Sequence, residues 1–404
     1  MPEFVQEPAP AKPRFVGPAL RTDFLPFAPP TLGEEEIAEV VDTLRSGWLS
    51  TGPKTKRFER EFARALGAET GLALSSCTAA LHLALSVLDI QPGDEVITTP
   101  YTFCATANVI EHVGAKTVLA DVEPDTLNID PAAVEAAITD RTRAIMVVHL
   151  AGHPVDLDEI RAIARRRGIP IIQDAAHSLP ASYRGEVIGS HTDLTAFSFY
   201  ATKNLTTAEG GMLVGDPGLV EKARVLSLHG MSRDSWQRYA RSGSWYYEVV
   251  EPGFKYNMMD IQASLGLWQL KRLGGFHQRR MEVAAAYTDS FLGHPALETP
   301  AVRPYVEHAW HLYVLRLRPE ALRIGRDEFL EELAERNIGG SVHFIPIHMH
   351  PYYRDRYGWA EDAFPVAADG YRRALSLPLH PGLSDGDVRD VIAAVLGIAE
   401  DYAA

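Results

Sequence analysis

The first group in the sequence that could do chemistry is a lysine just past an apolar stretch, in Phe197-Ser-Phe-Tyr-Ala-Thr-Lys-Asn204. A lysine amine forms a Schiff base with an aldehyde once the amine is desolvated or otherwise activated. Most lysines that follow a strand are ordinary surface groups, so Lys203 by itself decides nothing. Three further segments favour a functional role for Lys203, because each puts a ligand-binding group at the end of a predicted strand.

The second segment, Ile171-Ile-Gln-Asp-Ala-Ala-His177, is an apolar run that ends in an acid. An acid at the carboxyl end of a strand faces the ligand crevice of an α/β sheet. There a carboxylate can keep a pyridinium nitrogen protonated, which makes the ring an electron sink. The alternative is an aspartate that caps the next turn, and it is weak because no clear helix pattern follows Asp174.

Two more segments place groups that could bind a ligand at the end of a predicted strand. Leu74-Ser-Ser-Cys-Thr-Ala-Ala-Leu81 is a strand that turns into a helix, and the free N–H groups of such a helix start attract anions such as phosphate. Thr98-Thr-Pro-Tyr-Thr-Phe103 brings aromatic side chains to the place where a planar ring could be covered. Alone, these would be an ordinary capped helix and ordinary core packing. Together, four strand ends in order supply an anion site, an aromatic cover, an acid and a lysine.

These groups need a scaffold, and the alternation of short apolar and amphipathic stretches predicts one. Strands are expected at 71–75, 94–99, 115–120, 143–150, 169–174, 193–199 and 211–215, and helices at 79–89, 104–113, 131–138 and 156–167. Such alternation predicts a mostly parallel sheet between helices. Ligands of these sheets bind at the carboxyl ends of the strands, where the four segments meet.

The rest of the chain adds helices and a smaller unit. Thr31-Leu-Gly-Glu-Glu-Glu predicts a helix capped by Thr31. Further helices are expected at 55–66, 218–226, 259–291, 327–337 and 384–402, and strands at 310–317 and 340–345. Residues 1–30 contain eight prolines and predict an extended arm. We therefore expect an α/β fold with an arm over 1–30, a large domain over 31–275 and a smaller C-terminal α/β domain over 276–404.

Composition narrows the class of protein. The charged fraction is 23% and the net charge is −14, which argues against a nucleic-acid-binding or anionic-membrane surface. No apolar run approaches the ~20 residues that a membrane span needs, and no signal peptide is evident. With only Cys77 and Cys104, no disulfide framework is expected, and the cytoplasm is the expected location.

From about residue 22 to its end, the chain resembles the DegT/DnrJ/EryC1/StrS family of nucleotide-sugar aminotransferases, which depend on pyridoxal phosphate. The four segments carry this resemblance together with Ser46-Gly-Trp-Leu-Ser-Thr-Gly52, Glu209-Gly-Gly211, His229-Gly230, Gly253-Phe-Lys-Tyr-Asn257, Trp310-His-Leu-Tyr313 and Leu377-Pro378. One departure is Phe199-Tyr-Ala-Thr-Lys203, where many relatives have Phe-His-Pro-x-Lys. The resemblance implies the aspartate-aminotransferase (type I) fold, with a large cofactor-binding domain and a smaller C-terminal domain.

The resemblance also implies roles for particular residues. Lys203 would carry the cofactor as a Schiff base, and Asp174 would pair with its pyridine nitrogen. His177 would contact the phenolic oxygen of the cofactor, and Phe103 would stack on its ring. The phosphate would be held by the backbone of Thr78 and Ala79 and by the hydroxyl of Ser198. Asn257 would reach the phosphate of a neighbouring subunit's cofactor. The active site would thus be shared within a homodimer.

The implied reaction transfers an amino group from L-glutamate to a nucleotide-linked keto sugar, with pyridoxamine phosphate as intermediate. Segments such as Arg21-Thr-Asp-Phe-Leu-Pro-Phe27 look like the branch that acts on 4-keto sugars, so we expect a dTDP- or UDP-linked 4-keto-6-deoxyhexose and a 4-amino product. Amination at C3 is the alternative. A sugar dehydratase of the same fold is less well supported, because those relatives carry His in place of Lys203. A non-catalytic binding protein would not need Lys203, Asp174 and a phosphate site together.

Some candidates for substrate contacts rest on residue type alone. Thr51 stands in a glycine-flanked turn and could contact the sugar. His229 precedes a glycine and either touches the donor carboxylate or the sugar, or has a structural role only. His343 is a further candidate for substrate contact, and with His348 and His350 it lacks the carboxylate or cysteine partners of a metal site, so no metal is expected. The polar segment 231–254, with Arg233, Arg238 and Arg241, is either a nucleotide-diphosphate contact or a solvated loop.

Overall fold

The computed structural model describes residues 21–231 and 247–404. The first twenty residues of the expected arm lie outside this range, and so do Arg233, Arg238 and Arg241. Within the described residues, no helix is both long enough and apolar enough to cross a membrane.

A seven-stranded sheet forms the centre of the larger part of the molecule, in the order β1-β9-β8-β5-β4-β2-β3. Only β9 runs against its neighbours, since it pairs antiparallel with both β1 and β8 while the remaining pairs are parallel. The carboxyl ends of six strands therefore meet at one edge, together with the start of β9. The strands are β1 (Gly71–Leu74), β2 (Glu95–Thr98), β3 (Lys116–Leu119), β4 (Thr142–Val148), β5 (Ile171–Asp174), β8 (Leu194–Ser198) and β9 (Gly211–Val214).

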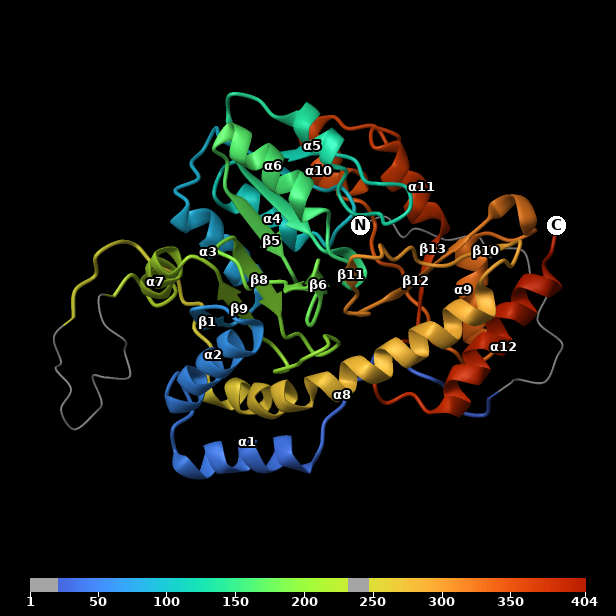
Figure 1. Ribbon diagram of the computed structural model, residues 1–404, viewed down its shortest axis with the longest axis horizontal. Helices are drawn as coiled ribbons and strands as arrows, with labels where there is room; N and C mark the ends of the chain where they lie inside the picture. Colours follow the sequence, from blue (N-terminus) through green and yellow to red (C-terminus); the bar gives the residue numbers. More distant parts are fainter. Residues whose placement is uncertain (1–20, 232–246) are drawn as a thin grey trace, which may run out of the picture.

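Helices cover both faces of this sheet (Figure 1). One apolar core lies between the sheet and α2 (Pro53–Leu66), α5 (Pro131–Ala137), α6 (Leu157–Arg167) and the first half of α8 (Asp260–Phe291). The other core lies between the sheet and α3 (Cys77–Val87), α4 (Ala105–His112) and α7 (Pro217–Leu226). The predicted mostly parallel sheet between two helix layers is confirmed, and each of its seven predicted strands is present with both ends within two residues of the prediction.

Local sequence signals explain where these helices begin. Asp130, Asp156 and Asp216 each accept a hydrogen bond from a backbone N–H in the first turn of the helix that follows. Such side-chain caps satisfy donors that the helix cannot pair by itself. At α3 the cap is Ser76, whose Oγ accepts from the N–H of Ala79 at 3.1 Å. The chain thus leaves β1 and enters α3 within two residues, at the edge where the strands end.

A second, smaller assembly packs against the other half of α8, which runs under both parts in Figure 1. Its sheet has the order β10-β12-β13, with β10 (Leu297–Glu298), β12 (Tyr313–Leu317) and β13 (Ala374–Leu377), all antiparallel. The helices of this assembly are α9 (Arg326–Glu335) and α12 (Asp385–Asp401). Of the two helices between them, α10 (Pro351–Tyr357) lies against α4 and β3 of the larger part, and α11 (Pro365–Arg373) packs between β12 and the larger part. A further small sheet joins β6 (Ser182–Tyr183), β7 (Glu186–Val187) and β11 (Val306–Glu307). The expected domain boundary at residues 275/276 falls inside α8 and stays a prediction.

Two expectations about the ends of elements were wrong. Residues 340–345 do not form a strand: only one bridge, between Ser341 and Ser376, ties this segment to the free edge of β13, because the rings of His343 and Phe344 pack against Phe27 and His177 instead. The helix expected after Thr31 is α1 (Glu34–Ser46), and its N-cap is Gly33 rather than Thr31. The side chain of Glu36 accepts from the N–H of Gly33 at 2.9 Å, so the acid in the first turn supplies the cap.

The described part of the arm lies against the smaller assembly. Leu25 is buried and forms a parallel bridge with Ile338. Arg21 pairs with Asp387 and Asp390 at the start of α12, at 2.6 and 2.7 Å. These contacts fix residues 21–25 to the C-terminal part of the chain.

Candidate active site

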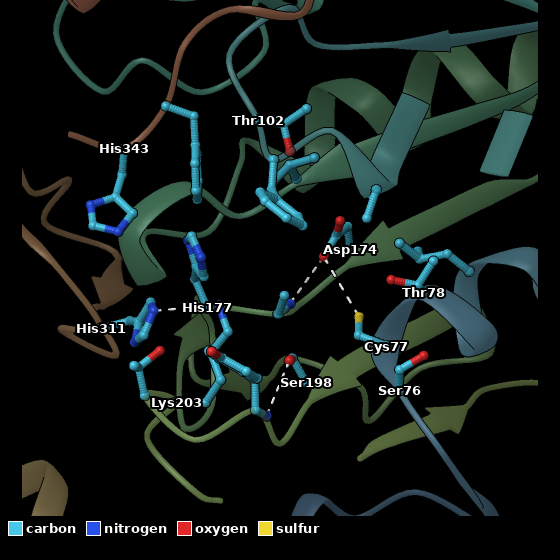
Figure 2. A pocket seen from close by; sticks show the side chains of 18 of the residues that line it. Ser76, Cys77, Thr78, Thr102, Asp174, His177, Ser198, Lys203, His311 and His343 are labelled. Carbon is cyan, nitrogen blue, oxygen red and sulfur yellow. Dashed lines mark hydrogen bonds between the residues drawn. The ribbon is translucent and has the colours of Figure 1, made fainter. Parts of the chain in front are cut away.

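The strand ends enclose a cavity of about 470 Å³ at the edge predicted from the sequence. Figure 2 shows its labelled side chains: His343, His311 and Lys203 lie toward one end, and Ser76, Thr78 and Ser198 toward the other. Of the predicted site residues, those that line this cavity are Thr78, Phe103, Asp174, His177, Ser198, Lys203 and His343. The four chemical segments of the sequence thus contribute to one cavity.

Asp174 is the last residue of β5, and its carboxylate is buried on the wall of the cavity. Oδ1 accepts from the N–H of Ala176 at 3.1 Å, and Oδ2 accepts from the hydroxyl of Thr106 at 2.9 Å. The thiol of Cys77 lies 4.0 Å from Oδ1. Burial raises the pKa of Asp174, against the opposing effect of these donors. No lysine or arginine of residues 21–231 and 247–404 forms an ion pair with this carboxylate, so it can accept a cationic N–H from a ligand.

Lys203 follows β8 by five residues, and its side chain enters the same cavity. Burial lowers the pKa of Lys203 to about 8, although the nearby charges of Cys77 and Asp174 act in the opposite direction. Near physiological pH a larger fraction of this amine is therefore neutral than in an ordinary lysine, and the neutral form is the one that attacks an aldehyde. Its Nζ lies 3.4 Å from Nε2 of His311.

His177 stands three residues after Asp174, and its hydrogen bonding defines its tautomer. The N–H of Ala151 donates to Nδ1 of His177 at 3.2 Å, so Nδ1 carries no proton. Burial lowers the pKa of His177 well below its ordinary value, so the ring is neutral and its proton is on Nε2. The ring therefore offers one N–H donor, which suits a ligand oxygen.

The start of α3 forms the polar end of the cavity. Ser76, Cys77 and Thr78 line it, and Ser198 from the end of β8 joins them. Gly211 allows this arrangement, because a Cβ at this position would lie 2.4–2.6 Å from backbone atoms of Ser76 and Cys77. The close approach of β9 to the helix start thus requires glycine. Ala79 does not line the cavity, and its N–H donates to Ser76 Oγ, as described above.

Three predicted residues lie away from the cavity lining. Asn257 donates through Nδ2 to Oγ1 of Thr51 at 2.6 Å, and Thr51 Oγ1 donates to the carbonyl of Met258 at 2.5 Å. His229 has a positive φ of 59° and donates its backbone N–H to the carbonyl of Phe254. Thr51 and Asn257 therefore form one cluster outside the cavity, and the structure does not bring His229 to Lys203.

Sequence reasoning missed several side chains of the cavity. His311 was present only within the family mark Trp310-His-Leu-Tyr313, and no feature of the sequence tied it to Lys203. Phe344 also lines the cavity, stacked against His177 with ring centroids 5.7 Å apart. His311 and Phe344 come from the smaller assembly, more than 100 positions after Lys203. Within the described residues, no three His, Cys, Asp or Glu side chains are grouped as metal ligands.

The residues present fit pyridoxal phosphate. A buried carboxylate without a cationic partner suits a protonated pyridine nitrogen, and a lysine with a lowered pKa suits the aldehyde. The neutral His177 offers an N–H to a ring oxygen, and the start of α3 suits a phosphate. Phe103, 56% exposed at the cavity, offers an aromatic face to a planar ring.

Comparisons with known proteins agree with this site. The model of the DegT/DnrJ/EryC1/StrS aminotransferase family matches residues 30–396. The chain is 54% identical over 382 residues to the spore coat polysaccharide biosynthesis protein SpsC of Bacillus subtilis (strain 168), covering 94% of this chain and 98% of that protein.

Several solved structures are similar to this chain over nearly its whole length. The putative sugar aminotransferase Spr1654 of Streptococcus pneumoniae in its PMP form has a TM-score of 0.88 and 38% identity, covering 93% of this chain and 99% of that one. Its PLP form has a TM-score of 0.87, with 37% identity over 94% and 99% of the two chains. Helicobacter pylori PseC, an aminotransferase involved in the biosynthesis of pseudoaminic acid, has a TM-score of 0.87 and 30% identity over 94% and 100%.

Proposed function

Since this chain belongs to the DegT/DnrJ/EryC1/StrS aminotransferase family, whose enzymes aminate nucleotide sugars with pyridoxal phosphate, we propose that it transfers the amino group of L-glutamate to a nucleotide-linked 4-keto sugar. The fold is that of the type I pyridoxal-phosphate enzymes, as expected. The observation that carries the proposal is the position of Lys203 and Asp174 in one cavity, at the ends of adjacent strands β8 and β5.

The chain's own groups would hold the cofactor at four points. Asp174 would accept the pyridine N–H, His177 would donate to the phenolic oxygen, and Phe103 would cover the ring. The phosphate would be held by backbone N–H groups at the start of α3, at Thr78 and Ala79, and by the hydroxyl of Ser198. For Ala79 this requires its N–H to be shared with Ser76, as described above.

Lys203 then has two tasks. Its neutral Nζ would bind the aldehyde carbon of the cofactor until an incoming amine takes its place. The freed Nζ would then act first as a base that removes the proton from the donor carbon, and next as an acid that delivers this proton to the cofactor carbon that had carried the lysine. A pKa near the working pH allows one amine to do both. When bound, pyridoxal phosphate supplies the electron sink that makes this proton removable, and it stores the amino group as pyridoxamine phosphate between the two halves of the reaction.

The identity of the keto sugar is a separate part of the proposal. The 4-keto branch is favoured by the segments quoted above, and the substrate we propose is a dTDP- or UDP-linked 4-keto-6-deoxyhexose. His343 is the one candidate for substrate contact that lines the cavity. The name of SpsC favours a product used in a surface polysaccharide. Both cysteines are unpaired, which is compatible with work in the reducing cytoplasm.

A second copy of the chain completes the site in this proposal. Asn257 does not line the cavity of its own chain, so its expected role at a phosphate requires a neighbouring subunit. Phe103 and Tyr200 at the cavity and Met259, two residues after Asn257, are 44–56% exposed. A homodimer with shared sites would cover them. Mixing two impaired variants, Lys203→Ala and Asn257→Ala, should then restore activity through mixed dimers that hold one intact site. Two independent sites would give no recovery.

The function is tested with purified protein loaded with pyridoxal phosphate. L-Glutamate should convert the visible band of the lysine-bound cofactor to the band of pyridoxamine phosphate, with release of 2-oxoglutarate. Addition of a dTDP- or UDP-linked 4-keto-6-deoxyhexose should then restore the first band and give a 4-amino sugar, identified by NMR. A spectrum that glutamate leaves unchanged would contradict the proposed donor. Turnover of a 3-keto but not a 4-keto nucleotide sugar would replace C4 with C3 as the position of amination.

A further inference from the structure

His311 lies beside Lys203 without any role assigned to it so far. It is buried, it belongs to the loop before β12, and its Nε2 lies 3.4 Å from Nζ of Lys203 (Figure 2). Hydrogen bonds of catalytic groups are often long before substrate and cofactor are bound, so this distance fits a working contact. The question is which of the two groups donates.

Asn204 answers that question by fixing the tautomer of His311. Its Nδ2 donates to the carbonyls of Leu179 and Ala309, both at 2.8 Å. These two bonds use both amide hydrogens, so Oδ1 is the atom that faces Nδ1 of His311 at 3.2 Å. An oxygen can only accept, so Nδ1 of His311 carries the proton. Nε2 therefore presents a lone pair toward Lys203.

Burial keeps this lone pair free of a proton, and a nearby buried arginine adds to the effect. Arg280 donates to the carbonyls of Trp310, His311 and Leu379. No carboxylate of the described residues pairs with Arg280, whose pKa is lowered to about 9 by burial. Burial lowers the pKa of His311 well below its ordinary value, and the charges of Lys203 and Arg280 act in the same direction. The imidazole stays neutral and keeps its acceptor.

We propose that His311, oriented by Asn204, is a positioning residue that accepts a hydrogen bond from the ammonium form of Lys203 and so holds Nζ toward the cavity. The order Asn204, His311, Lys203 is then a chain of three groups in which a fixed amide orients an imidazole and the imidazole orients the reactive amine. The inference rests on the proposed role of Lys203. It extends that role to a residue from the smaller assembly, so the two assemblies must be docked for the lysine to be held.

Other titratable groups also face this pair and must stay constant in any test. Asp174 and Cys77 face Lys203 from the ends of β5 and β1, and both favour its charged form. His177 and His343 face it from the loop after β5 and from the segment after α9, and both are neutral because burial lowers their pKa. None of these four accepts a hydrogen bond from Nζ in the structure. The acceptor contact is therefore specific to His311.

The test uses the cofactor-free protein and pyridoxal phosphate as the probe, so it does not depend on the sugar. The rate at which the visible band appears after mixing follows the neutral fraction of Lys203, and its pH profile gives the apparent pKa of the amine. His311→Leu removes the acceptor at similar volume, whereas His311→Gln places a carbonyl oxygen near the position of Nε2. His191, which is half-buried and does not line the cavity, provides the control His191→Gln.

Without the acceptor, the ammonium form loses a hydrogen bond, so the inflection of His311→Leu should move to lower pH by about one unit. His311→Gln should restore most of the shift, and His191→Gln should match wild type. A His311→Leu profile that superimposes on wild type would overturn the inference, as would equal shifts in the Leu and Gln variants. If the Leu variant does not fold, His311→Ala is the second acceptor-free variant. A wild-type protein that forms no visible band at any pH would instead contradict the proposed role of Lys203.

Discussion

The substitution Asp174→Asn tests the electrostatic part of the site with the least change of shape. In the native protein Oδ1 accepts from Ala176 and Oδ2 from Thr106. An asparagine can keep the bond from Ala176 only by turning its amide group toward Thr106. The hydroxyl of Thr106 can then accept from this amide, because it can direct its own hydrogen to the hydroxyl of Thr102, which lies 2.9 Å away. The fold should therefore tolerate the change, while the acceptor for a pyridine N–H is replaced by a donor.

The size of the expected rate loss follows from two effects of this replacement. A hydrogen bond to a charged group contributes about 1.5–3 kcal/mol, and a buried partner left unpaired costs about 1–3 kcal/mol more. A combined loss of roughly 3–5 kcal/mol corresponds to about 10²–10⁴-fold in rate, since each 1.36 kcal/mol is tenfold. Because the pyridine nitrogen would lose its proton, this loss should fall on the proton-transfer step.

The assay is a single half-reaction. Asp174→Asn loaded with pyridoxal phosphate is mixed with L-glutamate, and the decay of the visible band gives the rate constant. Asp193→Asn is the matched control: Asp193 binds Arg161 and Gln173 at the opposite end of the sheet and does not line the cavity. We expect the control to react within a few-fold of wild type. A rate for Asp174→Asn within threefold of wild type, with the cofactor bound, would refute the assignment of Asp174.

Two further predictions concern the cofactor-free protein and the phosphate end of the cavity. Because burial raises the pKa of Asp174, the folded protein binds its proton more tightly than the unfolded chain, so the carboxylate lowers stability as pH rises through the raised value. Cofactor-free Asp174→Asn should thus melt about 1–3 °C above wild type at pH 7, with the difference lost in acid; a lower melting temperature at pH 7 would contradict this. Gly211→Ala should strain the start of α3 by about 1–3 kcal/mol and weaken pyridoxal phosphate binding roughly 10- to 100-fold in equilibrium dialysis. Gly274→Ala, where a Cβ meets nothing within 4 Å, should leave binding unchanged, and equal affinities of the two variants would argue against the phosphate site.

The sequence predicted the large sheet well because its elements carry strong local signals. Each strand is a short apolar run, and aspartate or serine caps mark the starts of the helices between them. The ends of parallel strands must meet at one edge, so residues as far apart as Thr78 and Lys203 could be placed together without a structure.

The sequence predicted the smaller assembly less well, for a physical reason. The segment 340–345 has apolar residues of strand type, but whether it pairs along its length depends on tertiary contacts, and the rings of His343 and Phe344 pack against Phe27 and His177. The contact of His311 with Lys203 likewise depends on how the two assemblies dock, and no local pattern encodes that docking. The tautomers of His177 and His311 each depend on a single hydrogen bond that only coordinates reveal. His177 accepts one from the N–H of Ala151, and His311 donates one to Oδ1 of Asn204.

The central claim is that Lys203 carries the cofactor, and reductive trapping tests it most directly. Protein loaded with pyridoxal phosphate is reduced with borohydride, digested and analysed by peptide mass spectrometry. The account predicts a single stable phosphopyridoxyl label on Lys203, absent when L-glutamate is added before reduction and absent in Lys203→Ala. A label on another lysine, or no label in a protein that shows the visible band, would contradict it.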